Sequence, residues 1–396
     1  MTAASSNTGQ LRYIKETVAG TTPTTGNGKE LRTTQPTMKA GLTTVKSTEI
    51  NKFRQVQSST VTDLSVDGGL DFELSAKEYD PFIESVLFGE FAGLGEVTGT
   101  FTSTDTKLSL VGATLTPLKP GTWFKVYAPA SEPEAVRRYY AKTWFKVGSV
   151  SGTDVTLAAG QQVPAPYRIT GKAGYKFSQK VVQGGTGTKA PSFTLEWEQA
   201  DINQFLVYRG MMPNTLSLNF EVGAIVKGSV GFMGMTHDIT QATTLPGSPE
   251  ASFGEDVMNS VSDMGVIEAA GKNLLSNDDF IKSLKFDVNN NLRGQKAIGH
   301  FGNAGVGVGE LAVSGTIEAY FQNADLYKKW LNSEVITVVF GVSDNNGNGY
   351  LVELPKVKFR EGSVNGIQKD QDVMLSLPFD AFYDKAANTG VRIYKA

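Results

Sequence analysis

Apolar and polar side chains alternate along three separate stretches of the chain, residues 70–75, 193–198 and 316–321. In each stretch every second residue is apolar, and the residues between are mostly acidic or hydroxylic. A period of two places alternate side chains on opposite faces of a strand, so these stretches predict half-buried β-strands. Similar short runs recur from Met38 onward, and the sequence therefore predicts a mainly β fold.

A segment with helical spacing follows each of these strands, at residues 80–87, 201–206 and 323–331. In the first segment Asp80 can cap the helix and Pro81 can occupy its first turn. We therefore expect three short helices, one after each strand.

Residues 193–220 and 315–342 share the order strand, helix, break and strand at nearly the same spacing, although few residues are identical. This pattern predicts a duplicated unit; the alternative is that strand–helix pairs recur by chance in any mixed domain. Inside the first unit, at residues 96–189, short strands recur every 8 to 12 residues or so, which is typical of a small closed or sandwiched β module. Strands interleaved with the main sheet would give the same pattern.

Two polar segments complete the predicted organisation. The first 37 residues are rich in Thr, Gly, Asn and Pro and lack hydrophobic periodicity, and the stretch after Asp238 contains Pro, Gly and Ser. The predicted parts are an N-terminal arm (1–37), a first β unit (38–95 and 190–238), an inserted β module (96–189), a linker (239–277) and a second β unit (278–390).

Composition narrows the classes of protein. The 396 residues include no Cys and only two His, so thiolate nucleophiles, disulfide frameworks and His-rich or Cys-rich metal sites are excluded. The net charge of -3 argues against tight nucleic-acid binding through a basic face. No apolar run approaches the ~18 residues of a membrane-spanning helix, and the first ten residues lack the pattern of a secretory signal.

Four patterns could carry chemistry, and each has a simpler structural interpretation. His237 beside Asp238 lacks a nucleophile elbow, and the pair Glu196 and Glu198 lies on one strand face without a sugar cleft. The glycine-rich segment 302–310 leads into a strand and not into a phosphate-binding helix. The segment Asp344–Gly349 resembles a calcium loop but lacks the terminal Glu, and an Asn-Gly hairpin turn explains it. We therefore predict no enzymatic activity, no cofactor and no metal, with calcium at 344–349 left open.

Several segments in a fixed order resemble the tail tube proteins of bacteriophages with long, non-contractile tails. These are a Ser-x-Glu-Ile segment (47–50), an Arg-Gln-Val (54–56), a Tyr-Asp before a short helix (79–80), a Ser-Phe-Thr-x-Glu strand (192–196) and a Gly-Ser-x-x-Phe-Met-Gly end (228–234). No single motif is specific, and their order carries the resemblance.

The resemblance covers most of residues 38–235, and residues 292–321 are similar to the C-terminal part of longer members. It implies two tube-type β-sandwich or barrel domains, each with a short α-helix, plus the inserted module. It further implies self-association into stacked rings, a hollow tube through which double-stranded DNA passes without specific binding, and contacts with other tail proteins at the tube ends. The expected location is the virion tail, assembled in the cytoplasm of the host bacterium, with no membrane partner.

A bore that DNA must traverse is expected to be acidic or neutral, because lysines and arginines would hold the duplex. The candidate lumen-facing residues are the acidic residues of the alternating strands: Glu73, Glu196, Glu198 and Glu318. The alternative function is a discrete β-rich binding module, such as a capsid decoration or receptor-binding protein.

Strand geometry predicts the number of chains per ring. If each tube-type domain gives about four tilted strands, roughly 12 strands leave a bore of about 14 Å, and roughly 24 strands leave about 40 Å, which admits a duplex. Six domains are then required. We predict a trimeric ring with pseudo-sixfold symmetry if the duplication holds, and a hexamer otherwise. The polar segments 1–37 and 240–276 are expected to contact neighbouring subunits and to belong to neither core.

Overall fold

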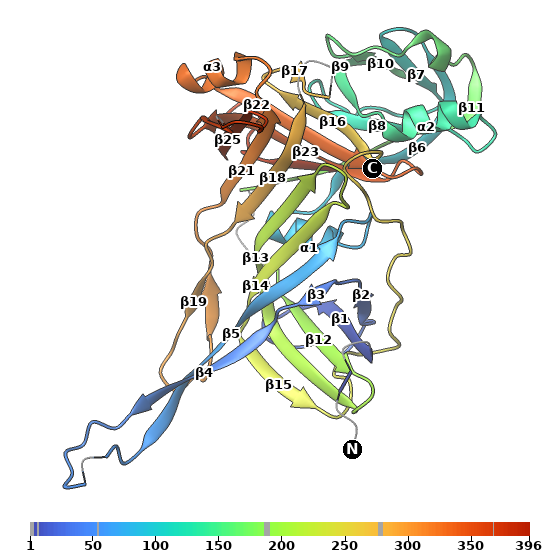
Figure 1. Cartoon of the computed structure of the whole chain (residues 1–396). Helices are drawn as coiled ribbons and strands as arrows, with labels where there is room; N and C mark the ends of the chain where they lie inside the picture. The colour runs from blue at the N-terminus through green and yellow to red at the C-terminus, as the bar shows by residue number, and fades with distance from the viewer. Residues whose placement is uncertain (1–3, 6–7, 54, 186–190, 276–279, 367) are drawn as a thin grey trace.

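The computed structural model describes residues 4–5, 8–53, 55–185, 191–275, 280–366 and 368–396. Strands dominate the described part, and its α-helices are three short segments, which confirms the predicted mainly β fold class (Figure 1). The first unit lies at the bottom of Figure 1, and the second unit and the inserted module lie at the top.

The first unit is a sandwich of two sheets with one helix. Its elements are β1 (Gly9–Lys15), β2 (Lys29–Leu31), β3 (Gln35–Pro36), β4 (Lys39–Lys46), β5 (Ser59–Glu73), α1 (Asp80–Val86), β12 (Phe193–Gln199), β13 (Gln204–Glu221), β14 (Lys227–Met233) and β15 (Thr236–Thr240). The first half of β13 pairs with β12 and β15, and its second half pairs with β14. The strand changes sheets near Gly210, whose φ of +68° suits a residue without a side chain.

Helix α1 closes the space between these sheets. Phe82 is fully buried, and its ring centroid lies 5.0 Å from that of Tyr13, 5.0 Å from that of Phe193 and 5.7 Å from that of Phe232. These partners come from β1, β12 and β14, so one aromatic side chain joins both sheets. Asp80 does not cap the helix as predicted; its carboxylate accepts a hydrogen bond from Tyr350 Oη and pairs with Lys395.

The second unit continues the first without a break in its sheet. Its elements are β16 (Met264–Ala269), β17 (Lys272–Asn273), β18 (Ile281–Asn289), β19 (Arg293–Gln295), β20 (Gly305–Gly307), β21 (Ala312–Tyr320), α3 (Asp325–Leu331), β22 (Ile336–Ser343), β23 (Gly349–Phe359), β24 (Ser363–Asn365), β25 (Met374–Ala381) and β26 (Arg392–Lys395). Strand β18 pairs with β13 over seven residues, from Thr215↔Asn289 to Glu221↔Ser283. The buried residues of both units form one core.

The inserted module is a closed barrel. It consists of β6 (Ala92–Ser103), β7 (Lys107–Val111), β8 (Trp123–Tyr127), α2 (Glu134–Lys142), β9 (Phe145–Ser151), β10 (Asp154–Leu157), a 3₁₀ turn (Ala165–Tyr167) and β11 (Lys172–Gln183). The pairings run β11, β6, β7, β10, β9, β8 and back to β11, around a separate core. Strand β26 joins the barrel to the second unit, because it pairs with β11 on one side and β23 on the other.

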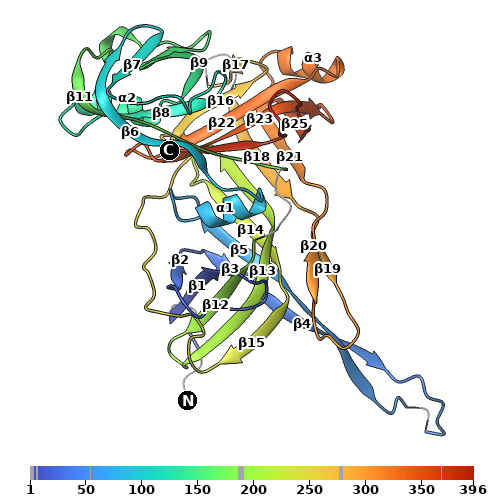
Figure 2. The ribbon, with the colours of Figure 1, turned by 180° about the vertical axis from the view of Figure 1, so that it is seen from behind.

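We call the sheet that runs from the first unit into the second the shared sheet. Two hairpins project from it on the same side of the molecule (Figures 1 and 2). The long hairpin is formed by β4 and β5 and spans residues 39–73. The short hairpin is formed by β19 and β20 and spans residues 293–307. In each unit a hairpin is followed by a seven-residue helix, α1 or α3.

The prediction of a helix at residues 201–206 is wrong. A turn follows β12, and Gln204 already begins β13. The apolar spacing of Phe205 and Val207 belongs to this buried strand. The proposed alignment of 193–220 with 315–342 therefore matches strands but not the helix.

The prediction that residues 1–37 lie outside either core is wrong for β1 and β2. Strand β1 pairs with β12 along its whole length, and Leu11, Tyr13 and Leu31 are buried. Residues 1–3 and 6–7 of the predicted arm, and the predicted boundary at residues 189 and 190, lie outside the described residues.

The predicted linker, residues 239–277, is also part of the folded structure where it is described; residues 276 and 277 are outside that part. Met258, Ile267 and Leu274 belong to the shared core, and β16 pairs with β22. The part without regular strands, 241–256, runs along the outside of the first unit (Figure 1). It is fixed there by side-chain hydrogen bonds described below.

Candidate functional site: the polar face of the shared sheet

One face of the shared sheet is polar across both units. The strand order is β5, β14, β13, β18, β21 and β25, with β3 and β4 along one edge and β23 and β24 along the other. Alternate residues face the core. Apart from Gly231, Pro378 and a few residues at strand ends, the residues between them are charged, hydroxylic or amide. Those residues are Asp71, Glu73, Lys227, Ser229, Thr215, Ser217, Asn219, Lys285, Asp287, Asn289, Ser314, Thr316, Glu318, Ser376 and Asp380.

The strand registers align these side chains in rows. One row crosses all six strands: Asp71, Ser229, Ser217, Asp287, Ser314 and Asp380. The next row contains Glu73, Lys227, Asn219, Lys285 and Thr316. Neighbours in and between rows interact: Ser217 Oγ donates to Asp287 at 2.6 Å, and Lys285 Nζ lies 3.2 Å from the other carboxylate oxygen.

The face is acidic overall and hollowed. Its five named carboxylates (Asp71, Glu73, Asp287, Glu318, Asp380) outnumber the ammonium groups of Lys227 and Lys285. At the edge, Lys358 lies opposite Asp380 in the register and Arg360 pairs with Asp380 at 3.4 Å, so these groups sum to -1. A cavity of about 490 Å³ lies over β5, β14, β13 and β18 and is lined by Asp71, Glu73, Ser217, Asn219, Lys227 and Lys285. This arrangement presents hydroxyl groups and negative charge without a clustered basic patch.

Two of the four predicted lumen residues lie on this face. Glu73 ends β5, and Glu318 on β21 accepts a hydrogen bond from Ser283 Oγ at 3.1 Å. Alternation alone located both, because the opposite side of each strand packs into the core.

Glu196 and Glu198 do not lie on this face, because β12 belongs to the other sheet of the first unit, where it pairs with β1 and the first half of β13. Glu196 is fully buried, and its carboxylate accepts hydrogen bonds from Thr243 Oγ1 (2.6 Å), Thr244 N (2.7 Å) and Thr244 Oγ1 (2.9 Å). Glu198 pairs with Arg12 of β1 at 2.7 Å. The lumen assignment of Glu196 is therefore wrong, since segment 241–256 covers its face of the strand.

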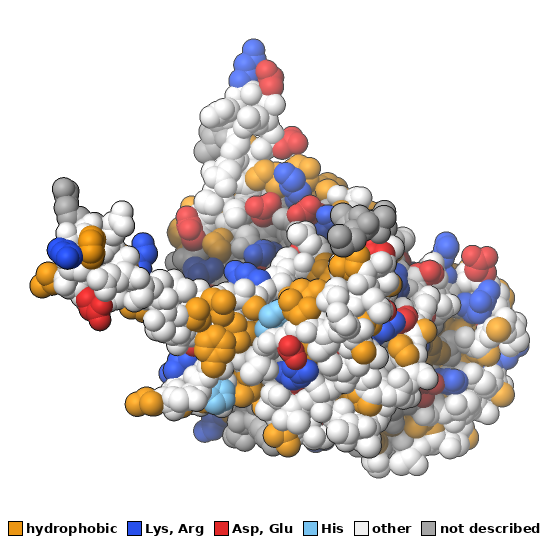
Figure 3. All heavy atoms as spheres, turned by 90° about the horizontal axis from the view of Figure 1, so that it is seen from below, with side chains coloured by type: hydrophobic (Ala, Val, Ile, Leu, Met, Phe, Trp, Pro, Cys, Tyr) orange, Lys and Arg blue, Asp and Glu red, His pale blue; other side chains and the backbone are white. Residues whose placement is uncertain are grey.

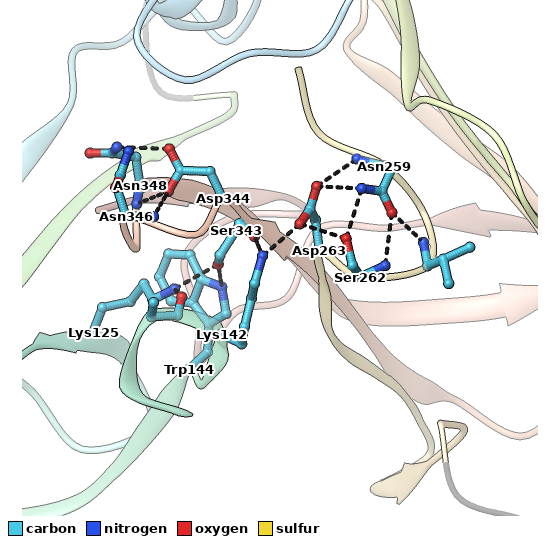
Figure 4. Close-up of polar contacts among 12 residues, drawn as sticks. Lys125, Lys142, Trp144, Asn259, Ser262, Asp263, Ser343, Asp344, Asn346 and Asn348 are labelled. Atoms are coloured by element: carbon cyan, nitrogen blue, oxygen red, sulfur yellow. Dashed lines mark hydrogen bonds and ion pairs between the residues drawn. The ribbon is translucent and has the colours of Figure 1, made fainter. Parts of the chain in front are cut away.

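The segment Asp344–Gly349 forms the turn between β22 and β23, as the hairpin interpretation expected. The Asp344 carboxylate accepts hydrogen bonds from Asn346 N (2.8 Å) and Asn348 N (2.9 Å), and its other oxygen from Asn348 Nδ2 (2.8 Å) (Figure 4). These donors occupy the oxygens that a calcium ion would need. Within the described residues, no group of three or more His, Asp or Glu could hold a metal ion.

The same turn lies in the interface that fixes the barrel on the second unit (Figure 4). Lys125 of the barrel is fully buried; its Nζ donates to Ser343 Oγ at 2.6 Å and lies 5.0 Å from the centre of the Trp144 ring. Lys142 pairs with Asp263 at 2.5 Å. Burial lowers the pKa of Lys125 well below its ordinary value, because a buried ammonium loses its hydration. This interface is structural, since packed side chains enclose it.

Sequence reasoning missed the residues of the face on β13, β14, β18 and β25. Strand β18 does alternate, with Leu284, Phe286 and Val288 buried, so its polar positions Lys285 and Asp287 were detectable. Their alignment with Asp71 and Asp380 was not, because it depends on pairing between residues far apart in the sequence, such as Asp71 and Ser229.

Comparison with known proteins identifies the class. The profile of the phage tail tube protein family matches residues 6–381, almost the whole chain. The chain therefore belongs to the phage tail tube protein family and has a structural role in the virion tail. No curated protein matches the sequence. Among the described residues, no helix has the length and apolar character needed to cross a bilayer.

Proposed function

We propose that this chain forms rings that stack into a hollow tube, and that the polar face of the shared sheet lines the bore through which DNA passes. The observation that carries the proposal is the continuity of this sheet across both units. A six-stranded sheet that packs one face on a core and leaves the other face polar suits the wall of a wide, water-filled channel. The family membership supports the same assignment.

The edges of the sheet allow the ring to close. In the described structure, β4 pairs only with β5, and β24 pairs only with β25, so each edge offers unpaired backbone groups. Pairing such edges between chains removes them, as closure does in any barrel. The edge at β3 and β4 of one chain would then meet the edge at β23 and β24 of the next.

Strand number favours three chains per ring. Each chain supplies β3/β4, β5, β14 and β13 from the first unit and β18, β21, β25 and β23/β24 from the second. Three chains give roughly 24 strands, and tilted strands that each occupy about 6.8 Å of circumference enclose a clear bore of about 40 Å. Six chains would double the circumference and leave far more room than a duplex needs.

The charge of the face suits passage and not retention. Asp71, Asp287 and Asp380 would repeat around the bore in one row, with serines between them. Each of these carboxylates repels the phosphates of a duplex, and Lys227 and Lys285 lie beside carboxylates that offset their charge. DNA therefore gains little from counterion release at this wall.

Stacking requires a contact between rings, and the hairpins are the candidates. The face from which they project shows gathered hydrophobic side chains near the base of the long hairpin (Figure 3). The tip of the long hairpin exposes Ile50, Phe53 and Val56. Exposed apolar groups of this kind mark surfaces that another protein covers. We assign to this end of the molecule the contact with the next ring. At the two ends of the tube, the terminal rings contact other tail proteins, and the virion is assembled in the host cytoplasm.

Electron microscopy of the purified protein tests the proposal. We expect tubes with threefold rotational order and the polar face inward. True sixfold order with one unit of each chain in the wall would favour the hexamer. Discrete particles with no rings at any concentration would favour a binding module and contradict the proposed function.

A further inference from the structure

The two hairpins differ in what they contact. The long hairpin is free along its outer part: all residues of β4 are exposed, and Leu42, Val45 and Val61 expose 61%, 55% and 45% of their surface. The short hairpin lies against the base of the long one (Figure 2). Equivalent, independent contacts from two duplicated units would require both hairpins to be free.

The contacts between the hairpins are specific. Lys296 Nζ of the short hairpin lies 2.8 and 2.9 Å from the two carboxylate oxygens of Asp63 on β5 and donates to Leu64 O at 3.0 Å. The ammonium group of Lys296 lowers the pKa of Asp63 through this hydrogen bond, which is consistent with an ion pair.

A second attachment fixes the short hairpin to the turn between β14 and β15. The buried side chain of Asn303 donates to Gly234 O at 2.7 Å. Gly302 has a φ of +95°, and a Cβ added there would lie 2.6 Å from Met235 O. The backbone at Gly302 therefore approaches this turn as closely as only glycine permits.

Lys296 holds the long hairpin far from its tip, so a small rotation at this contact changes the position of the tip strongly. About 12 residues separate Asp63 from Asn51, which is ~40 Å of extended chain at ~3.3 Å per residue. A rotation of about 10° at Asp63 would displace the tip by ~7 Å, which is more than the range of a side-chain contact. A hairpin without lateral support would present its apolar tip in many directions.

We propose that the two hairpins act as one composite docking element, in which the short hairpin sets the direction of the long one and both contact a second copy of this chain in the next ring. Ile298 of the short hairpin is fully exposed beside the element, as is Ile50 at the tip. The contact between rings then occurs once per chain and not once per unit. This inference rests on the proposed function, because it assumes that rings stack.

The first experiment removes the attachment and leaves the core unchanged. Lys296→Met is compared with Lys107→Met, which breaks the Lys107–Asp154 pair of the barrel; the lysines expose 45% and 47% of their side chains and the aspartates 32% and 31%. We expect Lys296→Met to form normal rings but tubes that are several-fold shorter, and Lys107→Met to form normal tubes. The charge exchange Asp63→Lys with Lys296→Asp should restore part of the length.

The second experiment uses the absence of native cysteine. Single variants Ile50→Cys and Ile298→Cys are labelled with a maleimide as free subunits and as tubes, with Val111→Cys on the barrel as the control, since Val111 is 58% exposed. We expect tubes to protect positions 50 and 298 together and to leave position 111 reactive.

The outcomes separate this inference from the proposed function. If the native protein forms no rings, the proposed function fails. If tubes form normally from Lys296→Met, or if position 298 stays reactive in tubes, the composite element is wrong although the tube assignment stands. Loss of rings in Lys296→Met would also overturn the inference, because the contact would then hold the ring and not the stack.

Discussion

Replacing Glu196 by alanine separates the structural role of this residue from the lumen role that its sequence pattern suggested. Its carboxylate is fully buried and accepts three hydrogen bonds from Thr243 and Thr244. Hydrogen bonds to a charged group contribute about 1.5–3 kcal/mol each, and the desolvation cost of the buried carboxylate, which the alanine variant no longer has, offsets part of their sum. We therefore expect Glu196→Ala to lower the free energy of local opening of segment 241–246 by about 3–5 kcal/mol.

Amide hydrogen exchange measures this opening directly. A change of about 3–5 kcal/mol corresponds to roughly 100-fold to 3,000-fold faster exchange at the Thr244 amide, at ~1.4 kcal/mol per factor of ten. Glu318→Ala is the control, because Glu318 comes from the same sequence pattern but accepts one hydrogen bond, from Ser283. Unchanged exchange at Thr244 in Glu196→Ala would refute the reasoning, as would an equal effect of both variants.

Three further predictions concern the interface between the barrel and the second unit, the bore and the N-terminal strand. The lowered pKa of Lys125 means that the unfolded chain binds more protons than the folded one between the lowered value and ~10.4, so stability rises with pH in that window. Lys125→Met should flatten this rise in chemical unfolding curves recorded at alkaline pH values below ~10.4. Changing Asp71, Asp287 and Asp380 together to Lys should make tubes retain duplex DNA in a salt-dependent manner, and retention that is insensitive to salt would contradict the bore assignment. Deleting residues 1–31 should destabilise the first unit by several kcal/mol, because Leu11, Tyr13 and Leu31 are buried, and a truncated protein that melts like the full chain would contradict this.

The sequence was informative where a pattern is local. Alternation identified β5, β12 and β21, and Pro81 located the start of α1, because a strand face and a helix start depend on neighbouring residues. Leu11 and Tyr13 flank a single polar residue, which is too short a run to show a period, and they lie among Thr and Gly. Their burial comes from pairing with β12, about 180 residues away.

Glu196 shows why the face of a strand on which a residue lies was not enough to predict the residues that line the bore. Its parity along β12 is that of a polar face, yet segment 241–256 covers this face, and only the folded chain places the two together. The row of Asp71, Asp287 and Asp380 was hidden for the same reason, since register between distant strands is a tertiary property.

The position of β26 has a consequence for synthesis of the chain on the ribosome. The barrel ends at Gln183, but its pairing with the second unit goes through Arg392–Lys395, the last strand made. The intervening ~200 residues take roughly 10–40 s to translate at about 5–20 residues per second. During that interval the barrel has its own closed sheet and core but lacks the strand that ties it to the second unit. The backbone pairing that joins the barrel to the second unit therefore forms only when translation ends, so a chain that stops short of residue 392 keeps the side-chain contacts of Lys125 and Lys142 but lacks this strand.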